Sequence, residues 1–279
     1  MSSQARRKVD DLLHLERQEW DRFARTLSSI KKDDLLLEKE SILSDTWITA
    51  ALRIVDNVKG KRVLDCGCGT GITAVWFAKK GAAVQAFDIS PEMVAIAQRR
   101  AEVNGIEKEI TIRKRTFENI DYDDESFDIV FGSYILHHVS VDVAIKQISR
   151  ILKKRGRGIF VENSDANFIL NFGRRSLLGR YGLVRCGTPG EHPLTCQDIK
   201  NIAAHFSICN LHYPAFRFFE MFRRLLLPTW FQGVHDDSVM IQKAVGWWWK
   251  NLPKFDAWVY KHLPMARKYS YAFILEIVK

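Results

Sequence analysis

The chain has 279 residues, of which 47% are hydrophobic and 27% charged, as in a globular protein of one domain with additions. It holds no apolar stretch of about 18 residues and no apolar segment behind its basic start, so neither a membrane span nor a secretory signal is predicted. Its five cysteines match no zinc or disulfide spacing, so we expect reduced thiols, no metal site and a cytoplasmic protein.

The net charge of +9 is concentrated in the last part of the chain, where residues 164–279 hold 15 Lys and Arg against 8 Asp and Glu. Such an excess is typical of surfaces that meet nucleic acid, an anionic membrane or an acidic substrate. It is equally typical of a basic surface that only faces solvent. Charge alone therefore leaves all four interpretations open.

Two helices are predicted first, because apolar residues recur three and four positions apart in residues 12–30 and 42–58. From residue 62 onward, β-prone runs alternate with helical patterns. The predicted strands span residues 62–66, 83–88, 110–114, 127–132, 159–162, 207–213 and 271–278. The predicted helices among them span residues 72–80, 90–104, 141–153 and 195–205. This alternation predicts an α/β fold in which helices cover both faces of a seven-stranded, mostly parallel sheet.

Two segments interrupt the alternation. Residues 164–194 are basic and loop-like, and residues 214–268 form a helical, aromatic-rich insertion that holds five of the eight tryptophans. We predict an N-terminal helical cap at 1–58, a core at 59–213 that contains the first insertion, and a final core strand at 269–279. The aromatic insertion fits four roles: packed core, a lid over an apolar substrate, a membrane contact or a dimer interface.

The stretch VLDCGCGTG, residues 63–71, joins the first predicted strand to the next helix. Glycines let the backbone approach a ligand closely, and a helix N-terminus offers free N–H groups with a partial positive charge. The spacing differs from that of dinucleotide and triphosphate loops, and no lysine follows to reach a triphosphate. Asp88, at the end of the second strand, can accept both hydroxyls of a ribose, and no nearby arginine suggests a 2′-phosphate. We therefore expect an adenosine-like ligand without a pyrophosphate.

Four motifs follow one another along the chain: VLDCGCGTG, AFDIS, SFDIVFGSYILHHV and ILKKRGRGIFVEN. In order and spacing they resemble the motifs of class I S-adenosylmethionine-dependent methyltransferases, most of all the small-molecule branch that includes quinone-biosynthesis methyltransferases. The resemblance extends over residues 45–163 and more loosely over the flanks. It implies a Rossmann-like fold, S-adenosylmethionine as the cofactor and S-adenosylhomocysteine as the product.

The resemblance also implies cofactor contacts, which follow the ends of the first four strands. They are Asp65, Gly67, Gly69, Gly71, Asp88, Ile89, Ser90, Thr116, Phe117, Gly132 and Ser133. The loop glycines would line the methionine end, Asp65 would hold the loop and the amino group, and Asp88 would take the ribose. The two residues after Asp88 would flank the adenine, and the pair after the fourth strand would border the sulfonium. Thr116 and Phe117 depart from the Asp-Ala pair that often binds the adenine amino group in relatives.

Methyl transfer needs an acceptor held in line with an activated methyl group, and it needs a general base when the acceptor is a hydroxyl. The candidate catalytic residues are His138, His192 and Tyr134. His137 and Tyr181 are further candidates, although histidines are as often packed or capping residues, and in the family one of the two adjacent histidines usually faces the structure. Trp20, Phe23 and Trp47 either close the site or pack in the core, and packing is the favoured interpretation.

The acceptor is defined mainly by exclusion. The residues after the fourth strand lack the Asn/Asp-Pro-Pro-aromatic motif of amine-methylating nucleic-acid enzymes, and no cysteine stands there to attack cytosine. We therefore predict methyl transfer to a small-molecule or lipid-like acceptor held under the aromatic insertion, and we disfavour nucleic acid as a partner. The alternatives are an RNA or protein methyltransferase that uses the basic C-terminal third, and a cofactor-binding scaffold without activity. A homodimer and peripheral contact with the inner membrane face stay open.

Overall fold

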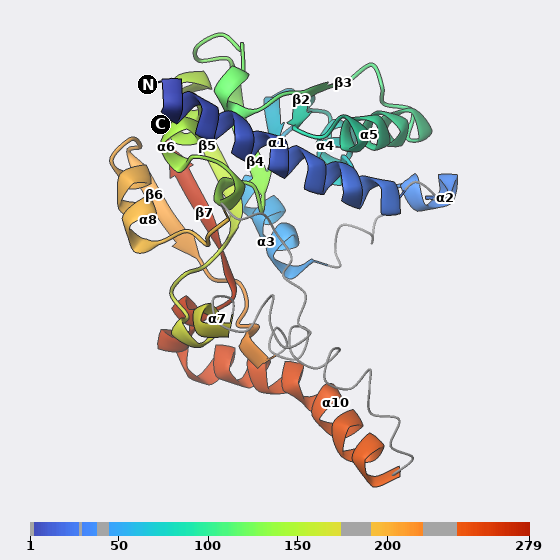
Figure 1. The fold of residues 1–279 in the computed structure, drawn as a ribbon, viewed down its shortest axis with the longest axis vertical. Coiled ribbons are helices and arrows are strands. Elements are labelled where there is room, and N and C mark those ends of the chain that lie inside the picture. The colour runs from blue at the N-terminus through green and yellow to red at the C-terminus, as the bar shows by residue number, and fades with distance from the viewer. Residues whose placement is uncertain (1–2, 28–29, 38–44, 174–190, 220–238) are drawn as a thin grey trace. The chain divides into compact units, whose positions relative to one another are not determined.

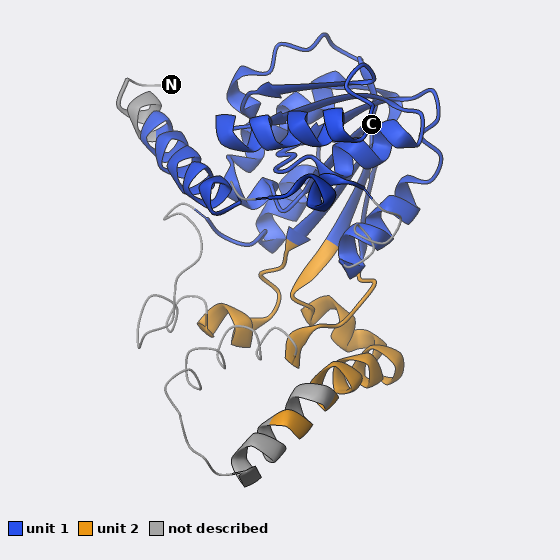
Figure 2. Cartoon of the chain, turned by 90° about the vertical axis from the view of Figure 1, so that its right-hand side faces the viewer, with its two compact units in different colours: residues 1–162, 187–212, 274–279 blue, residues 163–186, 213–273 orange. Residues whose placement is uncertain are grey.

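The computed structural model describes residues 3–27, 30–37, 45–173, 191–219 and 239–279. The chain divides into two compact units, which Figure 2 colours differently. Unit 1 consists of residues 1–162, 187–212 and 274–279, and unit 2 consists of residues 163–186 and 213–273. The sequence-based boundaries of the cap, the core and the insertions stay predictions.

A seven-stranded sheet has the strand order β3-β2-β1-β4-β5-β7-β6 (Figure 1). Its strands are β1 Arg62–Cys66, β2 Ala83–Asp88, β3 Ile110–Lys114, β4 Phe127–Ser133, β5 Leu152–Asn163, β6 Ile208–His212 and β7 Ala272–Val278. β1 pairs in parallel with β2 and β4, β2 with β3, and β4 with β5, whereas β6 and β7 are antiparallel. The structure thereby confirms the predicted Rossmann-like α/β fold with a mostly parallel sheet.

The helices alternate with the strands as predicted. The helices of unit 1 are α1 Ser3–Thr26, α2 Lys32–Leu35, α3 Thr46–Val55, α4 Ile72–Lys79, α5 Pro91–Val103, α6 Val141–Ile151 and α8 Cys196–Ala203, with the 3-10 helices η2 Phe117–Asn119 and η3 Leu136–His138. Unit 2 contains α7 Phe168–Phe172, α10 Val239–His262 and the 3-10 helix η5 Pro264–Tyr269. Ser90 caps α5 by accepting from the N–H of Met93, and Thr195 with Asp198 forms a capping box at the start of α8. α3 begins after Asp45, and residues 42–44 of the predicted helix lie outside the described residues.

The sheet order explains where a ligand can bind. Strands β2 and β3 lie on one side of β1, while β4 and β5 lie on the other, so the loops after β1 and β4 leave the sheet in opposite directions. In open parallel sheets this switch point forms a crevice outside the carboxyl ends of the strands. The two strands at the crevice are anchored by a buried core, in which the rings of Phe77 from α4 and Phe131 from β4 meet edge to face at 5.2 Å.

Several predicted boundaries are wrong. The first helix spans Ser3–Thr26 rather than residues 12–30, and the fifth strand begins at Leu152 rather than at residue 159. The apolar spacing of residues 141–153 predicts a helix to Lys153, but α6 ends at Ile151 and β5 begins at Leu152. Leu152 has an extended backbone, is fully buried and pairs with Phe127 of β4. An apolar residue at this position satisfies the helical and the strand pattern alike, so periodicity could not separate them.

Unit 2 has its own internal contacts. Asn167 caps α7 through its side-chain oxygen and donates from Nδ2 to the carbonyl of Tyr269 at 2.7 Å. No described helix is long and apolar enough to cross a membrane. Much of the predicted insertions lies outside the described residues: Tyr181 and Cys186 of the first, and Phe222, Leu225, Leu226 and Trp230 of the second.

We predict that Gly71→Ala lowers the free energy of unfolding by about 2–4 kcal/mol, measured by urea denaturation. Gly71 has φ +79°, and a Cβ there would lie 2.7 Å from the Cβ of Ala97 on α5, so the variant combines backbone strain with a clash. Gly105→Ala is the matched control, because Gly105 has φ +66° but no atom within 4 Å of an added Cβ. Equal losses in the two variants would show that the close approach of the glycine loop to α5 does not constrain the fold.

Candidate cofactor and acceptor site

A cavity of about 500 Å³ lies in unit 1 at the carboxyl ends of β1 to β4, where the strand order reverses. This volume is within the range of small-molecule sites, roughly 300–1,000 Å³. The cavity is lined by Leu13, Glu16, Trp20, Phe23, Asp45, Ile48, Gly67, Cys68, Gly69, Thr70, Ile72, Thr73, Phe87, Asp88, Ile89, Met93, Arg115, Thr116, Phe117, Ser133, Tyr134, Ile135, His138 and Val139. Seven of the eleven predicted cofactor residues are therefore on its wall, together with two of the three predicted catalytic residues.

Asp88 connects the glycine loop to the end of β2. Its Oδ2 accepts the N–H of Gly69 and its Oδ1 accepts the N–H of Ser90, each at 2.9 Å. Burial raises the pKa of Asp88, and these backbone N–H groups act against that rise. Asp88 lines the cavity, where its carboxylate can accept hydroxyl donors from a ligand. Beside it, a Cβ on Gly69 would meet no atom within 4 Å, so the loop leaves open space there.

Asp65 and Gly71 do not line the cavity, although both belong to the glycine loop. The hydroxyl of Thr73 donates to Asp65 Oδ2 at 2.6 Å. Burial outweighs this hydrogen bond and, with the nearby Asp88 carboxylate, raises the pKa of Asp65 to about 7. The structure thus places Asp65 where it holds the loop, and its predicted contact with the ligand amino group stays a prediction.

Arg100 is a second support that the sequence analysis missed. Its Nε donates to the carbonyl of Thr70 at 2.8 Å, and its guanidinium also donates to the carbonyl of Leu35 at 3.2 Å. Arg100 therefore joins the glycine loop, α5 and the end of α2. Arg100 is buried in the structure. In the sequence it is only one arginine within a predicted helix, and helical periodicity does not reveal which groups it contacts.

The wall after β3 carries Thr116 and Phe117, as predicted, with Phe117 packed edge to face on Phe87 at 5.3 Å. It also carries Arg115, whose guanidinium lies 2.7 Å from Asp121. The expectation that no arginine lies near Asp88 is therefore corrected, because the fold brings Arg115 to the same cavity. Ser90 is fully buried away from it, and its hydroxyl donates to Asp21 of α1 at 2.6 Å.

The loop after β4 is fixed by Glu162, a fully buried carboxylate near the end of β5. Its Oε1 accepts the N–H groups of Ile135 and Leu136 at 3.0 and 2.7 Å, and its Oε2 lies 2.7 Å from His137 Nδ1. His137 is therefore the histidine of the pair that faces the structure. The side chain of Ile135 packs against Gly132, because a Cβ added at Gly132 would lie 2.7 Å from an Ile135 side-chain carbon. Ser133 lines the cavity.

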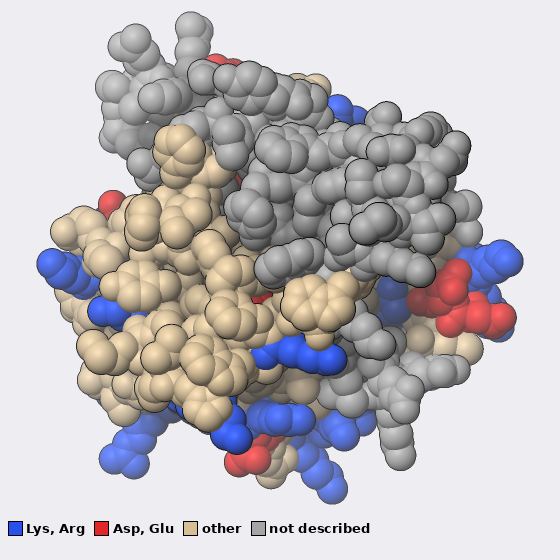
Figure 3. All heavy atoms as spheres, turned by 90° about the horizontal axis from the view of Figure 1, so that it is seen from below, with Lys and Arg blue, Asp and Glu red and all other residues tan. Residues whose placement is uncertain are grey.

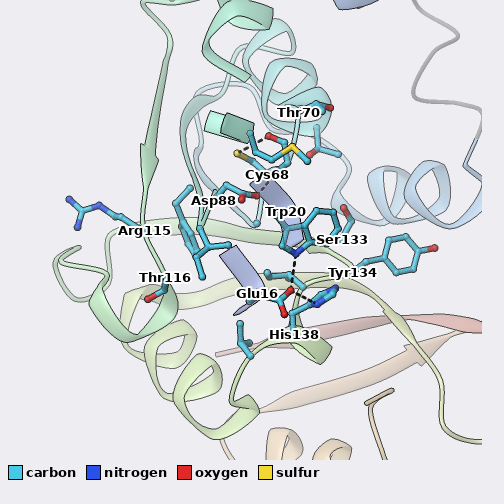
Figure 4. A pocket seen from close by; sticks show the side chains of 18 of the residues that line it. Glu16, Trp20, Cys68, Thr70, Asp88, Arg115, Thr116, Ser133, Tyr134 and His138 are labelled. Atoms are coloured by element: carbon cyan, nitrogen blue, oxygen red, sulfur yellow. Dashed lines mark hydrogen bonds and ion pairs between the residues drawn. The ribbon is translucent and has the colours of Figure 1, made fainter. Parts of the chain in front are cut away.

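Tyr134 also lines the cavity, and its backbone is in the left-handed region at φ +57°. A tyrosine in this conformation carries strain of roughly 1–3 kcal/mol and persists only when its surroundings enforce it. The hydrogen bond from Tyr134 N–H to the carbonyl of Val161, at 2.7 Å, and the Glu162 contacts next to it provide that enforcement. The Tyr134 ring extends away from His138 in Figure 4.

His138 lies on the wall between two carboxylates from distant segments. Its Nδ1 is 2.7 Å from Glu16 of α1 and 2.9 Å from Glu191, and Trp20 donates its Nε1–H to the same Glu16 oxygen at 2.7 Å (Figure 4). Neither oxygen lies along the N–H bond, so the contacts are ion pairs rather than aligned hydrogen bonds. Burial lowers the pKa of His138, but the two carboxylates outweigh it and raise the pKa to about 9. His138 is thus an imidazolium at neutral pH, which is unsuited to accept a proton.

The third catalytic candidate, His192, lies outside the cavity. His192 is exposed, its Nδ1 lies 3.3 Å from the Pro193 carbonyl, and it does not line the cavity, so its catalytic role stays a prediction. Its neighbour Glu191 is the residue that reaches His138. The donor atoms of His137, His138 and Glu191 lie within 4.8 Å of one another. Because Glu162 and Glu16 already bind the two imidazoles, we assign no metal to this group.

The N-terminal helices contribute more than sequence periodicity predicted. Leu13, Glu16, Trp20 and Phe23 recur every three to four residues along α1, and this face lines the cavity. Trp47 of α3 is buried in the core and does not line the cavity, as packing predicted. Trp20 and Phe23 line the cavity. The interpretation favoured from the sequence was that these two residues pack in the core.

Comparison with known proteins agrees with this geometry. The family described as "Methyltransferase domain" matches residues 64–160. A demethylmenaquinone methyltransferase of Tropheryma whipplei (strain Twist) is 34% identical over 185 residues, which cover 64% of this chain and 74% of the relative. The uncharacterized methyltransferase YcgJ of Bacillus subtilis (strain 168) is 36% identical over 103 residues, but the match spans only 40% of its length and 37% of this chain.

A solved structure matches almost the whole chain. The geranyl diphosphate C-methyltransferase from Streptomyces coelicolor A3(2) has a TM-score of 0.55 over 96% of this chain and 97% of its own, at 13% identity, which shows a shared fold. The chain belongs to the class I S-adenosylmethionine-dependent methyltransferases, and its cofactor is S-adenosylmethionine. Within this class it falls in the branch of the quinone-biosynthesis methyltransferases.

We predict that the stabilising effect of His138 decreases as the pH rises. The folded-state pKa of about 9 exceeds the ordinary value of 6.5, so the contribution is complete below pH 6.5 and is lost through pH 9. The difference in unfolding free energy between the wild type and His138→Gln should therefore shrink by on the order of 2–3 kcal/mol over this interval. Urea denaturation at several pH values measures it, with the exposed His205→Gln as the control. A difference that does not vary with pH would contradict the ion-paired state.

Proposed function

We propose that this chain transfers a methyl group from S-adenosylmethionine to a small-molecule or lipid-like acceptor, which binds in the same cavity against α1 and the loop after β4. The observation that supports this most is the composition of one cavity. One wall carries the glycine loop and Asp88, and the other carries apolar and aromatic side chains with few polar groups. Figure 4 shows Cys68, Thr70 and Asp88 toward one end and Glu16 and His138 toward the other.

The residues at the glycine loop fit the cofactor. Asp88 is fixed by the backbone N–H groups of Gly69 and Ser90 and lines the cavity, where it can accept ribose hydroxyls, and the open space at Gly69 lets a ligand approach the backbone. Ile89, Thr116 and Phe117 form a mostly apolar wall suited to an adenine ring. When bound, S-adenosylmethionine supplies a methyl group that its sulfonium activates.

The residues at the other wall fit an acceptor with an apolar body. Leu13 and Phe23 of α1, Ile48 of α3 and Val139 provide apolar surface, and Trp20 provides an aromatic one. The relative named demethylmenaquinone methyltransferase supports an acceptor of this kind. The predicted lid function of residues 214–268 is not needed for the proposal and stays a prediction.

The protein's contribution to the reaction is mainly positioning. A methyl group on a sulfonium needs an acceptor atom in line with it, and holding the two partners together can supply much of the rate acceleration. Glu162 fixes the loop that carries Ser133 and Tyr134, so this part of the wall is preformed. His138, as an imidazolium, positions Glu16 and does not remove a proton.

We predict that Asp88→Asn weakens the binding of S-adenosylhomocysteine by roughly 10- to 100-fold, because an amide cannot accept two N–H groups and two ribose hydroxyls at once. Isothermal titration calorimetry measures the affinity. The control is Asp123→Asn, which removes the same charge from an exposed position outside the cavity. Native affinity in the Asp88 variant would mean that Asp88 does not contact the cofactor.

The acceptor class is tested with S-adenosylmethionine labelled in its methyl group. We expect the full chain to label a component of the host's extracted lipids or small metabolites, and Asp88→Asn to lose most of this label at limiting cofactor. Label found only in RNA or protein would overturn the proposed acceptor and favour the alternatives based on the basic C-terminal third. Cofactor binding without any labelled product would favour a scaffold.

A further inference from the structure

Unit 2 exposes an unusual number of large apolar side chains. They are Phe168, Ile169, Phe172, Trp247, Phe255, Trp258, Leu263, Met265 and Tyr269. Two of them are the most exposed, with Met265 82% and Phe168 77% exposed. Single exposed apolar residues are common, whereas a group of large ones marks a surface that binds something. We call the part from Trp247 to Tyr269 the aromatic face.

Most of the aromatic face belongs to α10, and the rest follows it in η5. Phe255, Trp258 and His262 are three and four residues apart, so they project on the same side of the helix. The rings of Phe255 and Trp258 are stacked at 5.8 Å, and those of Trp258 and His262 lie 5.3 Å apart. The helix is packed within unit 2, because Asp256 accepts the N–H of Phe219 at 3.0 Å, the half-exposed Phe255 ring meets the Phe219 ring edge to face at 4.8 Å, and Val259 is buried. The exposure of the aromatic residues therefore does not result from an unpacked helix.

The charge on the aromatic face has one sign. Residues 247–269 contain five Lys and Arg and a single acid, Asp256, which is only 2% exposed. Lys254 and Lys261 are exposed next to Phe255 and His262 in the sequence. The guanidinium of Arg267 lies 4.1 Å from the centre of the Tyr260 ring. Figure 3, which views the chain from below, shows an area of uncharged residues with Lys and Arg side chains, and some Asp and Glu side chains, around it.

We propose that the aromatic face binds an anionic membrane surface, with α10 lying in the plane of the interface. Aromatic rings insert at the level of the lipid headgroups, while Lys and Arg side chains reach anionic phosphates. A second protein copy is a poorer complement, because the cores of protein interfaces are depleted in lysine and a copy would bring the same positive charge. No described helix could cross the bilayer, so this contact is peripheral. The inference goes beyond the proposed function, because it does not depend on which acceptor is methylated.

The test is co-sedimentation of the full chain with vesicles of phosphatidylcholine, with or without phosphatidylglycerol. We expect binding to the anionic vesicles that is at least roughly tenfold stronger than to the zwitterionic ones and that falls with added salt. Lys254→Glu with Lys261→Glu should weaken binding to anionic vesicles by at least roughly tenfold, at about 1 kcal/mol per basic residue. Phe255→Ser with Trp258→Ser should weaken it at any salt concentration, because it removes inserted apolar area.

Two control variants test whether any exposed apolar or basic residue, rather than the aromatic face in particular, accounts for vesicle binding. Ile208→Ser removes an exposed apolar side chain from β6 of unit 1, and Lys200→Glu reverses an exposed charge on α8. Both should bind vesicles like the wild type. All variants should keep native affinity for S-adenosylhomocysteine, so a failure here is distinct from a failure of the proposed function.

Three outcomes would overturn the inference. The first is no binding to either vesicle type, and the second is equal binding by the wild type and both aromatic-face variants. The third is a wild-type dimer in sedimentation that becomes monomeric in Phe255→Ser with Trp258→Ser, since this would show that a second copy covers the face.

Discussion

The carboxylate of Asp88 is the contact on which the cofactor site depends. By accepting the N–H groups of Gly69 and Ser90, it joins the glycine loop after β1 to the start of α5. Burying a charge in this way is tolerated because each oxygen has a backbone donor. The same residue also lines the cavity, so it holds the loop and faces the space in which we propose that the cofactor ribose binds.

A second carboxylate plays the corresponding structural role on the other side of the switch point. Glu162 binds the loop after β4 through two backbone N–H groups and His137, and so it enforces the strained backbone of Tyr134. α1 then closes the cavity, and the ion pairs among Glu16, His138 and Glu191 connect three segments far apart in sequence. Asp88 and Glu162 hold the two loops, and the Glu16–His138 contact and the Ser90–Asp21 hydrogen bond both connect α1 to the core.

Much of the fold and half of the site could be predicted from the sequence. The alternation of strands and helices, the caps at Ser90 and Thr195, and the glycine loop all depend on neighbours within a few residues. Residues that follow parallel strands gather at one edge of the sheet, which is why Gly69, Asp88, Thr116 and Ser133 lie around one cavity. The boundary at Leu152 was missed because one apolar residue fits both periods.

By itself, the sequence determined the class of fold, the cofactor loop and the acid at the end of β2, since these are set by local spacing along consecutive strands. Only the tertiary structure decided which histidine faces the cavity, that Glu191 contacts this histidine, that Arg115 lines the cavity and that Asp65 does not. It also decided that aromatic residues of α10 are exposed while its single acid is buried. The physical reason is common to all of these: burial, ion pairing and pKa depend on partners that are distant in the chain, and periodicity carries no information about them.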